Sequence, residues 1–455
     1  MTGARFLLVL LAALLPLVLG WQMVCLLFPL SGRATRLLKC SLGGTIGLGL
    51  ASLSFWAWRS AGGSWPPPFL LAETALWILA VLASAMVLKK RHSQETRIEP
   101  SRAAPRLLVW TSWMALLGGV WLFVARMAAE PHGRWDAWAM WNLKARFLAR
   151  GEAGWDALFA SSPGWSHPDY PLFLPATVAR LWNYAGGESW LGPALTAGGM
   201  FLLLAGLLVG ALRVLKGPVA AALAVPGLMG TWGLADRAAW QYADLPLALF
   251  MTASLACLAL HHRFGGRGPL VLAGAAAGLA AWTKNEGLLF AALLAFAWLA
   301  AGWFRKRPKE TASELLWMAA GALLPLGAAA VLKIGVPAPN DLVAAWADPA
   351  VWARLADPAR AGLIARSFFL EGLKLVTPAA LLAAWGLGGL RTDPQTARAG
   401  FFCLGVAGLC LAGYAVVYLA TPHDLAWHLS TSSSRLLTAL WPAGLLGLVL
   451  AVDME

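Results

Sequence analysis

Long apolar runs separated by short polar segments recur along the whole chain. A helix rises about 1.5 Å per residue, so roughly 20 apolar residues are enough to cross the hydrocarbon core of a bilayer. The first run is too long for a secretory signal peptide and lacks a small-x-small cleavage site, so we expect it to stay as a helix. The pattern predicts an all-α polytopic membrane protein with about 13 transmembrane helices. They are expected near residues 6–30, 41–58, 69–88, 107–125, 191–212, 218–234, 245–260, 268–282, 287–304, 313–332, 376–390, 399–420 and 436–452.

Composition agrees with this class. Of the 455 residues, 59% are hydrophobic and only 13% are charged. The formal charge of +13 raises nucleic acid as a partner, but no basic cluster is interleaved with aromatic residues, so positive cytoplasmic loops explain the charge better. The five cysteines fall in or beside apolar runs with no Cys-x-x-Cys spacing, which indicates core residues without disulfides or a thiolate metal site.

The basic residues orient the helices. Cytoplasmic loops carry an excess of Lys and Arg, and 19 of the 35 basic residues fall in short loops on one side. That side is expected to be cytoplasmic, which puts the N-terminus outside and the C-terminus inside. These residues are Arg33, Arg36, Lys39, Lys89, Lys90, Arg91, Arg97, Arg102, Arg106, Arg213, Lys216, Arg263, Arg267, Arg305, Lys306, Arg307, Lys309, Arg391 and Arg398.

One apolar segment, residues 171–186, decides the arrangement of the loops. It is short and contains two prolines, an arginine and an asparagine. A crossing there would place the basic cluster 305–309 outside, so we expect an amphipathic helix along the outer membrane surface. Residues 126–190 then form one long external loop, and residues 333–375 form a second. Residues 1–106 form an N-terminal set of transmembrane helices, and residues 107–455 form a module that carries both loops.

Acidic residues gather on the external side, and Asp136 stands out among them. It lies in "RWDAW", directly after an apolar run, and Lys144, Arg146 and Arg150 follow within four helical turns. Tryptophans at this depth are ordinary interface anchors, and an acid among them can be simply solvated. A carboxylate near several cations at the membrane surface also suits a site that holds a phosphate and moves a proton.

A second polar element, "HPDYPLFLP", follows in the same loop. It contains His167, Asp169 and Tyr170, framed by prolines that fix the backbone. The pattern fits a helix N-cap with a turn. It fits equally a rigid corner that presents a ligand or a supporting group to a site.

The later external loops contribute further ionisable residues. Asp244 opens an apolar run, where an acid is a routine helix cap, and "WTKNEG" brings Lys284 and Glu286 close to the membrane plane. The last loop, "YLATPHDLAWHLSTSSSRLLTALWP", contains His423 and Arg435. Its His and Asp residues leave a divalent metal open as a cofactor, although their spacing matches no known site.

Taken in order, these elements resemble the GT-C superfamily of polytopic glycosyltransferases. The likeness covers residues 107–442 and is nearest to the branch of the lipid A aminoarabinose transferases and protein O-mannosyltransferases. It rests on an acid after an early span, His-Pro-x-x-Pro, Asp-x-Pro, Thr-Lys-x-x-Gly and a final Tyr…Pro…Arg-Leu-Leu…Trp-Pro loop. The resemblance implies that Asp136 is the catalytic acid. It implies that Asp244 is the second acid and that His167 and Tyr170 form the juxtamembrane motif. Together with the charged and polar neighbours described above, the predicted substrate-binding residues are Lys144, Arg146, His167, Asp169, Tyr170, Asp244, Lys284, His423 and Arg435.

Two departures from the family pattern matter. The chain has four spans before the first large external loop, where the family usually has one. Asp136 is followed by Ala137 and Trp138 where the family often has a second acid. A second Trp-Asp-Ala sequence contains Asp156, so the choice between Asp136 and Asp156 as the base stays open.

The resemblance implies a glycosyltransferase of the inner membrane whose active site faces the periplasm. It would move a sugar from a polyprenyl-phosphate donor to a glycan, lipid or protein acceptor, with inversion and with an Asp as general base. Membrane lipid is then a partner and nucleic acid is not. Two alternatives remain: a transporter or flippase for envelope glycolipids, and a non-catalytic homologue that scaffolds an envelope complex. The crowding of charges in external loops, with Glu73 the clearest acid inside a span, favours the enzyme over the transporter.

Overall fold

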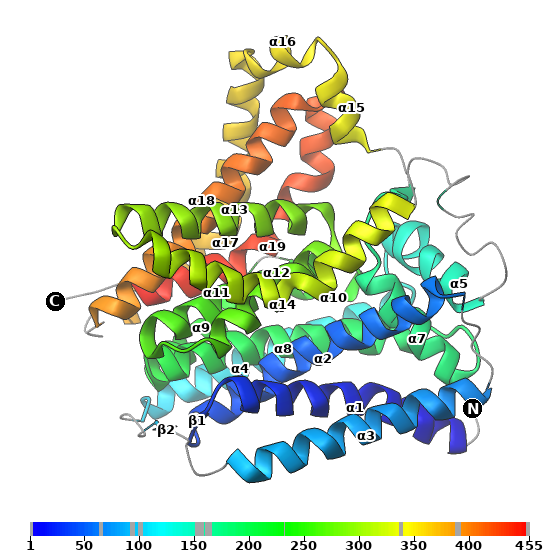
Figure 1. The fold of residues 1–455 in the computed structure, drawn as a ribbon. Helices are drawn as coiled ribbons and strands as arrows, with labels where there is room; N and C mark the ends of the chain where they lie inside the picture. Colours follow the sequence, from blue (N-terminus) through cyan, green and yellow to red (C-terminus); the bar gives the residue numbers. More distant parts are fainter. Residues whose placement is uncertain are drawn as a thin grey trace.

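The computed structural model is a bundle of long helices that run side by side (Figure 1). It describes residues 3–62, 67–91, 96–98, 103–150, 159, 166–231, 233–335, 340–386 and 393–451. Apart from one pair of two-residue parallel strands, β1 (Leu30–Ser31) and β2 (Thr96–Arg97), the regular elements in these ranges are helices.

The helices follow the order of the apolar runs. The first part of the chain contains α1 (Gly3–Leu27), α2 (Thr35–Ser60), α3 (Pro67–Arg91), α4 (Arg106–Ala129), the π-helix η2 (Ala137–Trp141), α5 (Asn142–Arg150) and α7 (Phe173–Ala185). The middle contains α8 (Leu191–Leu215), α9 (Pro218–Met229), α10 (Leu234–Ala239), α11 (Asp244–Phe264), α12 (Gly268–Thr283) and α13 (Asn285–Phe304). The last part contains α14 (Pro308–Gly335), α15 (Asp341–Ala347), α16 (Val351–Leu355), α17 (Pro358–Gly386), α18 (Pro394–Ala420) and α19 (Leu425–Ala451).

Ten helices in the described ranges are long and apolar enough to cross a membrane, so the chain is an all-α, multi-pass membrane protein. Ten of the 13 expected spans thus correspond to helices of this kind. The expected spans 218–234 and 268–282 coincide with α9 and α12, which are apolar but have only 12 and 16 residues. The expected span 376–390 falls on the end of α17 and on residues outside the described ranges, and α17 is not among the ten. The number 13 therefore stays a prediction.

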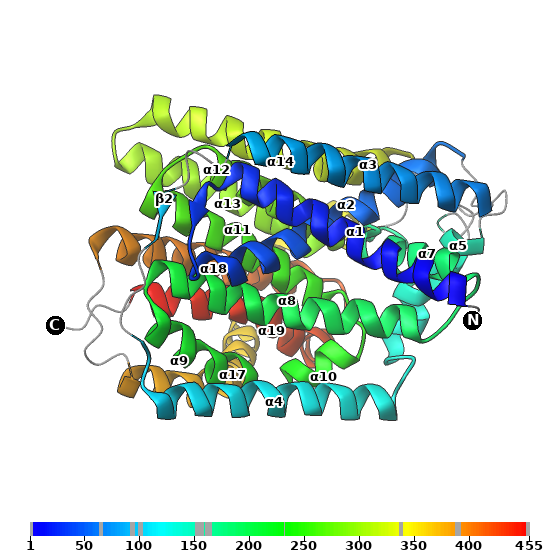
Figure 2. The same ribbon diagram turned by 90° about the horizontal axis from the view of Figure 1, so that it is seen from below.

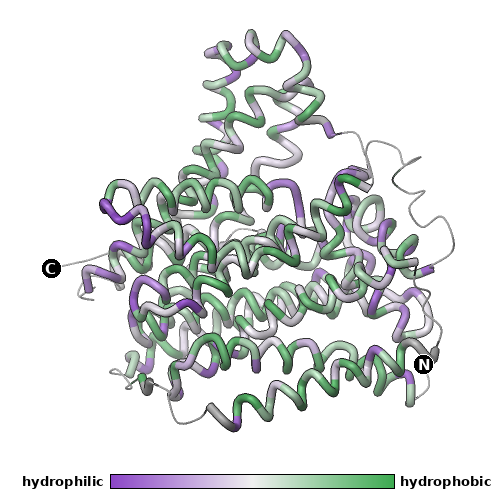
Figure 3. The backbone as a smooth tube through the Cα atoms, viewed as in Figure 1, coloured by the Kyte–Doolittle hydropathy of each residue, from purple (hydrophilic) through white to green (hydrophobic). Residues whose placement is uncertain are grey.

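The helices divide into a packed interior and a lipid-facing periphery. Helix α11 is buried along almost its whole length, and α2, α8 and α19 are mostly buried. Figure 2 shows α4 along one edge of the bundle and α3 with α14 along the opposite edge. These three helices expose many large apolar side chains, which is the arrangement expected of helices that face lipid. Figure 3 shows hydrophilic residues mainly at the two ends of the bundle and hydrophobic residues between them.

Small residues allow the closest helix contacts. Between α12 and α14, a Cβ atom on Gly274 would collide with the backbone carbonyl of Met318, and one on Gly321 would collide with that of Val271. Packing of this kind drives helix association where lipid removes the hydrophobic advantage of burying side chains.

Helix α7 corrects one expectation. A helix does form at 173–185, but its residues are buried except for Asn183 and Ala185, which are half-buried. The prediction of an amphipathic helix along the membrane surface is therefore wrong in its environment. Arg180, the residue that suggested a polar face, points inward and forms a buried ion pair with Glu73 of α3, with 2.8 Å between Nε and Oε1.

The segment that was expected to form a second external loop, 333–375, contacts the end of α18 and its connection to α19. Helices α15 and α16 project from the bundle at the top of Figure 1. Arg354 donates to the carbonyl of Ala420, and Arg360 donates to those of Tyr418 and Thr421. Asn340 joins this segment to the segment 126–190 through Asp169, with 2.7 Å between Nδ2 and Oδ2.

Candidate functional site

Arg435 joins residues from four separate segments at one end of the bundle. Its Nη2 lies 2.8 Å from Oδ2 of Asp136, and its Nε lies 2.8 Å from Oδ2 of Asp244. Asp244 in turn accepts from Nζ of Lys284 at 2.9 Å, and the same Nζ lies 2.8 Å from Oε1 of Glu286. Three carboxylates and two cations thus alternate in one chain of contacts, which we call the Arg435 cluster.

Helix ends position these side chains. Asp136 immediately precedes η2, and π-helical turns inside α-helices are often found at functional sites. Asp244 is the first residue of α11, where a negative charge is favoured by the exposed backbone N–H groups of the helix. Lys284 is the single residue between α12 and α13, and Arg435 lies within the first half of α19.

The cluster is most deeply buried at Asp244 and Lys284, and its other three residues are partly exposed. The side chains of Asp244 and Lys284 are each 4% exposed, whereas those of Asp136 and Arg435 are 14% and 19% exposed. Trp135 and Trp138 flank Asp136 and are largely exposed. Asp136 and Arg435 are therefore accessible from this face, whereas Asp244 and Lys284 are not.

The opposite charges of Asp244, Glu286 and Lys284 allow Asp244 and Lys284 to be buried. Burial alone would lower the pKa of Lys284, but the carboxylates of Asp244 and Glu286 outweigh it and raise that pKa above its usual value. A buried charge is costly unless it is paired and hydrogen-bonded, so Lys284 is held as a fixed cation. Its role is to hold Asp244, which in turn orients Arg435.

Aromatic rings form a floor beneath the cluster. The ring of Tyr242 lies 4.6 Å from the Arg435 guanidinium, and its hydroxyl accepts from the backbone N–H of Asp136. Burial, together with the charge of Asp136, raises the pKa of Tyr242 to about 12, so this hydroxyl stays protonated. The ring of Tyr170 lies 5.7 Å from Nζ of Lys284 and is stacked with the rings of His167 and Trp141.

His167 and Asp169 hold the corner on which Tyr170 sits. His167 has a φ of 47°, a left-handed backbone conformation that is rare for residues other than glycine. The buried Lys144 donates from Nζ to its carbonyl oxygen. Asp169 accepts from Asn285 and Asn340, and its own carbonyl accepts from Lys333 at 3.0 Å.

Lys144 differs from Lys284 in its partners. Its side chain is fully buried and lies over the rings of Trp141 and Tyr170, without a carboxylate in contact among the described residues. Burial lowers the pKa of Lys144 from its ordinary 10.5 to about 7, and the charge of Asp169 offsets only part of this effect.

Eight of the ten predicted site residues lie in the Arg435 cluster or in the layer that supports it. Asp136, Asp244, Lys284 and Arg435 form the cluster itself. The supporting contacts come from Lys144, His167, Asp169 and Tyr170.

Two residues predicted to bind substrate, Arg146 and His423, lie outside the Arg435 cluster, and their role in binding stays a prediction. Arg146 pairs with Glu188 at 2.9 Å, beside Arg150. His423 packs against Trp427 and His428 in the α18–α19 connection. Asp156 lies outside the described residues.

The metal alternative gains no support from geometry. In the ranges that the structure describes, no three His, Cys, Asp or Glu residues are grouped so that they could hold a metal ion. The His and Asp residues of the last loop therefore do not form such a group.

Several contributors were not assigned from the sequence. Glu286 shares the turn of Lys284 but was not placed in the site, and Tyr242 lies two residues before Asp244. Lys333 and Asn340 flank residues 336–339, far from the other motifs in sequence. An aromatic residue next to a helix-capping acid was the available signal for Tyr242. No local pattern marks Lys333 or Asn340, because their role arises from long-range packing.

Comparisons with protein-family models, with curated proteins and with solved structures find no match. The fold and the cluster thus define the chain as a multi-pass α-helical membrane protein with a charged site at one end of its bundle.

Proposed function

We propose that the protein is a membrane glycosyltransferase that takes a sugar from a polyprenyl phosphate at the external face, with inversion. One observation carries the proposal: the partly exposed Asp136 contacts Arg435, and the buried Asp244 holds that guanidinium from the other side. A proton acceptor and a fixed cation are thereby presented together at the end of the bundle.

Each reacting group has a place in this arrangement. The acceptor hydroxyl attacks the anomeric carbon, and its proton passes to the carboxylate of Asp136 as the new C–O bond forms. The bond between the anomeric carbon and the phosphate oxygen breaks, and its electron pair stays on the phosphate. Arg435 offsets the charge that develops there, and a preorganised cation does so without reorganising during the reaction.

The first test compares carboxylate variants in cells. Asp136→Asn keeps the shape and loses the proton acceptor, so turnover should fall by roughly 10²–10⁴-fold, the usual contribution of a general base. Asp348→Asn is the matched control, because Asp348 is a carboxylate of the second predicted external loop and also pairs with an arginine, at 2.7 Å from Arg354. Mass spectrometry of lipid-linked sugars and envelope glycans, in a deletion strain complemented with each variant, measures the result.

The outcomes separate the alternatives. Accumulation of donor lipid with Asp136→Asn, but not with Asp348→Asn, supports the proposal. Normal glycans with Asp136→Asn but none with Asp156→Asn would move the base to Asp156 and keep the reaction. Normal glycans with both variants would indicate a non-catalytic protein that scaffolds an envelope complex. A donor lipid that is chemically unchanged but redistributed between the leaflets would indicate a flippase.

A further inference from the structure

A polar pocket lies at the opposite end of the bundle from the Arg435 cluster. Helix α11 begins at Asp244 in the cluster, and its 21 residues extend about 30 Å to His261 and His262 near its other end. The turn between α13 and α14 and the start of α18 complete the pocket. Its two connected parts have volumes of about 200 and 540 Å³ and share His262, Arg305 and Arg307.

The carboxylates of the smaller part of the pocket, Glu310 and Glu314, contact donors within the protein. Glu314 accepts from Nε1 of Trp298 at 3.2 Å and lies 3.4 Å from Nε2 of His261. Glu310 lies 3.3 Å from Nη1 of Arg307. These carboxylates therefore have partners within the protein.

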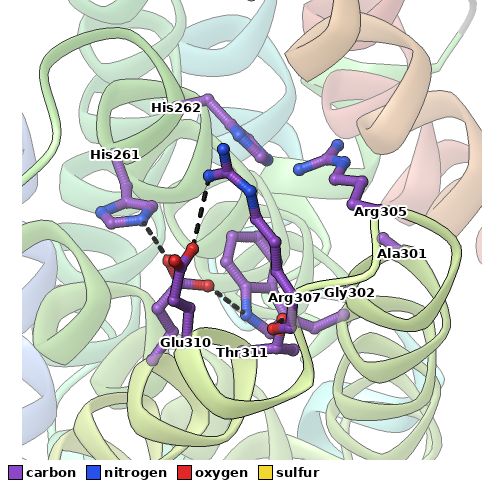
Figure 4. A pocket seen from close by; sticks show the side chains of 10 residues that line it. His261, His262, Ala301, Gly302, Arg305, Arg307, Glu310 and Thr311 are labelled. Carbon is purple, nitrogen blue, oxygen red and sulfur yellow. Dashed lines mark hydrogen bonds and ion pairs between the residues drawn. The ribbon is translucent and has the colours of Figure 1, made fainter.

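The larger part of the pocket is basic. It is lined by His262, Arg305, Arg307, Gln395 and Arg398, with no carboxylate among them. Within the described ranges, no ion pair or side-chain hydrogen bond engages Arg305 or Arg398. In Figure 4, His262, Arg305 and Arg307 gather at one side of the pocket, whereas His261 and Glu310 lie at the other.

The turn that presents two of these arginines has a defined conformation. Lys306 has a φ of 56°, in the left-handed region that residues other than glycine seldom adopt. The backbone N–H groups of Arg305, Lys306 and Arg307 donate back to the last turn of α13. The turn directs Arg305 and Arg307 into the pocket, while the exposed Lys306 and Lys309 line neither part.

We propose that this pocket binds a phosphate-bearing anion. Arginine offers a planar set of N–H donors that matches the oxygens of a phosphate. Arg305 and Arg398, from two elements, line the pocket together with Arg307, which also contacts Glu310. The charge distribution of the loops predicts that this end is cytoplasmic, where anionic lipid headgroups and soluble phosphates are both present. The inference is independent of the reaction proposed at the other end.

The experiment uses the full chain in nanodiscs of zwitterionic lipid. One arm titrates inorganic pyrophosphate by calorimetry. The other arm compares retention of phosphatidylglycerol with that of phosphatidylcholine by native mass spectrometry. Arg305→Gln/Arg398→Gln should weaken binding of whichever probe binds by about tenfold or more, because the variant removes two charged donors from the pocket.

The matched control is Lys306→Gln/Lys309→Gln, which removes the same charge from the same end without changing the pocket lining. Binding that survives in the control and falls in the arginine variant supports the proposal, and the responding arm identifies a soluble or a lipid phosphate. Arg305→Gln alone keeps the test valid if the double variant unfolds. An equal loss in the control, or no binding of either probe, would overturn the proposal.

Discussion

At the residue scale, two buried lysines show how partners determine charge. Lys284 contacts two carboxylates, which raise its pKa, whereas Lys144 contacts a carbonyl and two aromatic rings, and burial lowers its pKa to about 7. Lys284 is therefore a permanent cation that fixes the cluster. Lys144 is the lysine of the supporting layer whose protonation changes near neutral pH.

We predict that Lys144 makes stability depend on pH. The pKa of an unfolded lysine is about 10.4. Between pH 7 and that value the unfolded state binds more protons than the folded state, so stability rises with pH in this window. The methionine in Lys144→Met cannot titrate. The melting temperature of the wild type minus that of the variant should therefore increase between pH 7 and 10 and should stay constant below pH 7. Thermal unfolding of both proteins in detergent measures this, and an offset unchanged up to pH 10 would contradict it.

At the element scale, the sequence predicts helices better than their surroundings. Apolar runs located nearly every long helix, because the bilayer requires about 20 apolar residues per crossing. The same reasoning placed α7 at the surface, because Arg180 and Asn183 look like a polar face. Its burial depends on Glu73 of α3, about a hundred residues away, which no local pattern reveals. The proximity of Asp136, Asp244, Lys284 and Arg435 was inferred from a resemblance, and the structure supplies the contacts that join them.

The Glu73–Arg180 pair should be critical for attaching α3. Glu73 accepts from Arg180, Trp77 and Tyr184, while α3 otherwise faces outward along most of its length. Removing one member of a buried pair leaves the other charge uncompensated, so Glu73→Gln should destabilise the protein by about 3–5 kcal/mol. Thermal or denaturant unfolding of purified protein measures the change.

An exposed pair provides the control. Glu130 and Arg134 lie 2.8 Å apart with both side chains substantially exposed, so Glu130→Gln should change stability by less than about 1 kcal/mol. If Glu73→Gln costs no more than Glu130→Gln, the pair does not anchor α3.

At the scale of the whole molecule, α11, α12 and α13 connect the two ends of the bundle. Helix α11 leads away from Asp244, and α12 must return the chain, because Lys284 directly follows it and pairs with Asp244. Helix α13 then leads to Arg305 at the far pocket. The proposed external site and the proposed anion pocket thus lie at opposite ends of the same helices, and the orientation of the chain decides which one faces the cytoplasm.

Cysteine labelling tests that orientation. Gly187→Cys, at an exposed position near Arg146 and Glu188 with open space around its Cβ, should react with a membrane-impermeant maleimide in intact cells. Lys309→Cys, exposed beside the far pocket, should react only after permeabilisation. Both changes belong in a background with Cys25 and Cys40 replaced by Ser, because the other three cysteines are buried. The Arg435 cluster holds Asp136, Asp244 and Lys284 at one end of the bundle, so α9 returns the chain after α8, and α12 returns it after α11. Five passages along the bundle, by α8, α9, α11, α12 and α13, therefore separate the two positions, and this odd number puts them on opposite sides. Labelling of both in intact cells would refute the threading, and labelling of Lys309→Cys alone would move the Arg435 cluster to the cytoplasm, which contradicts the proposed reaction at the external face.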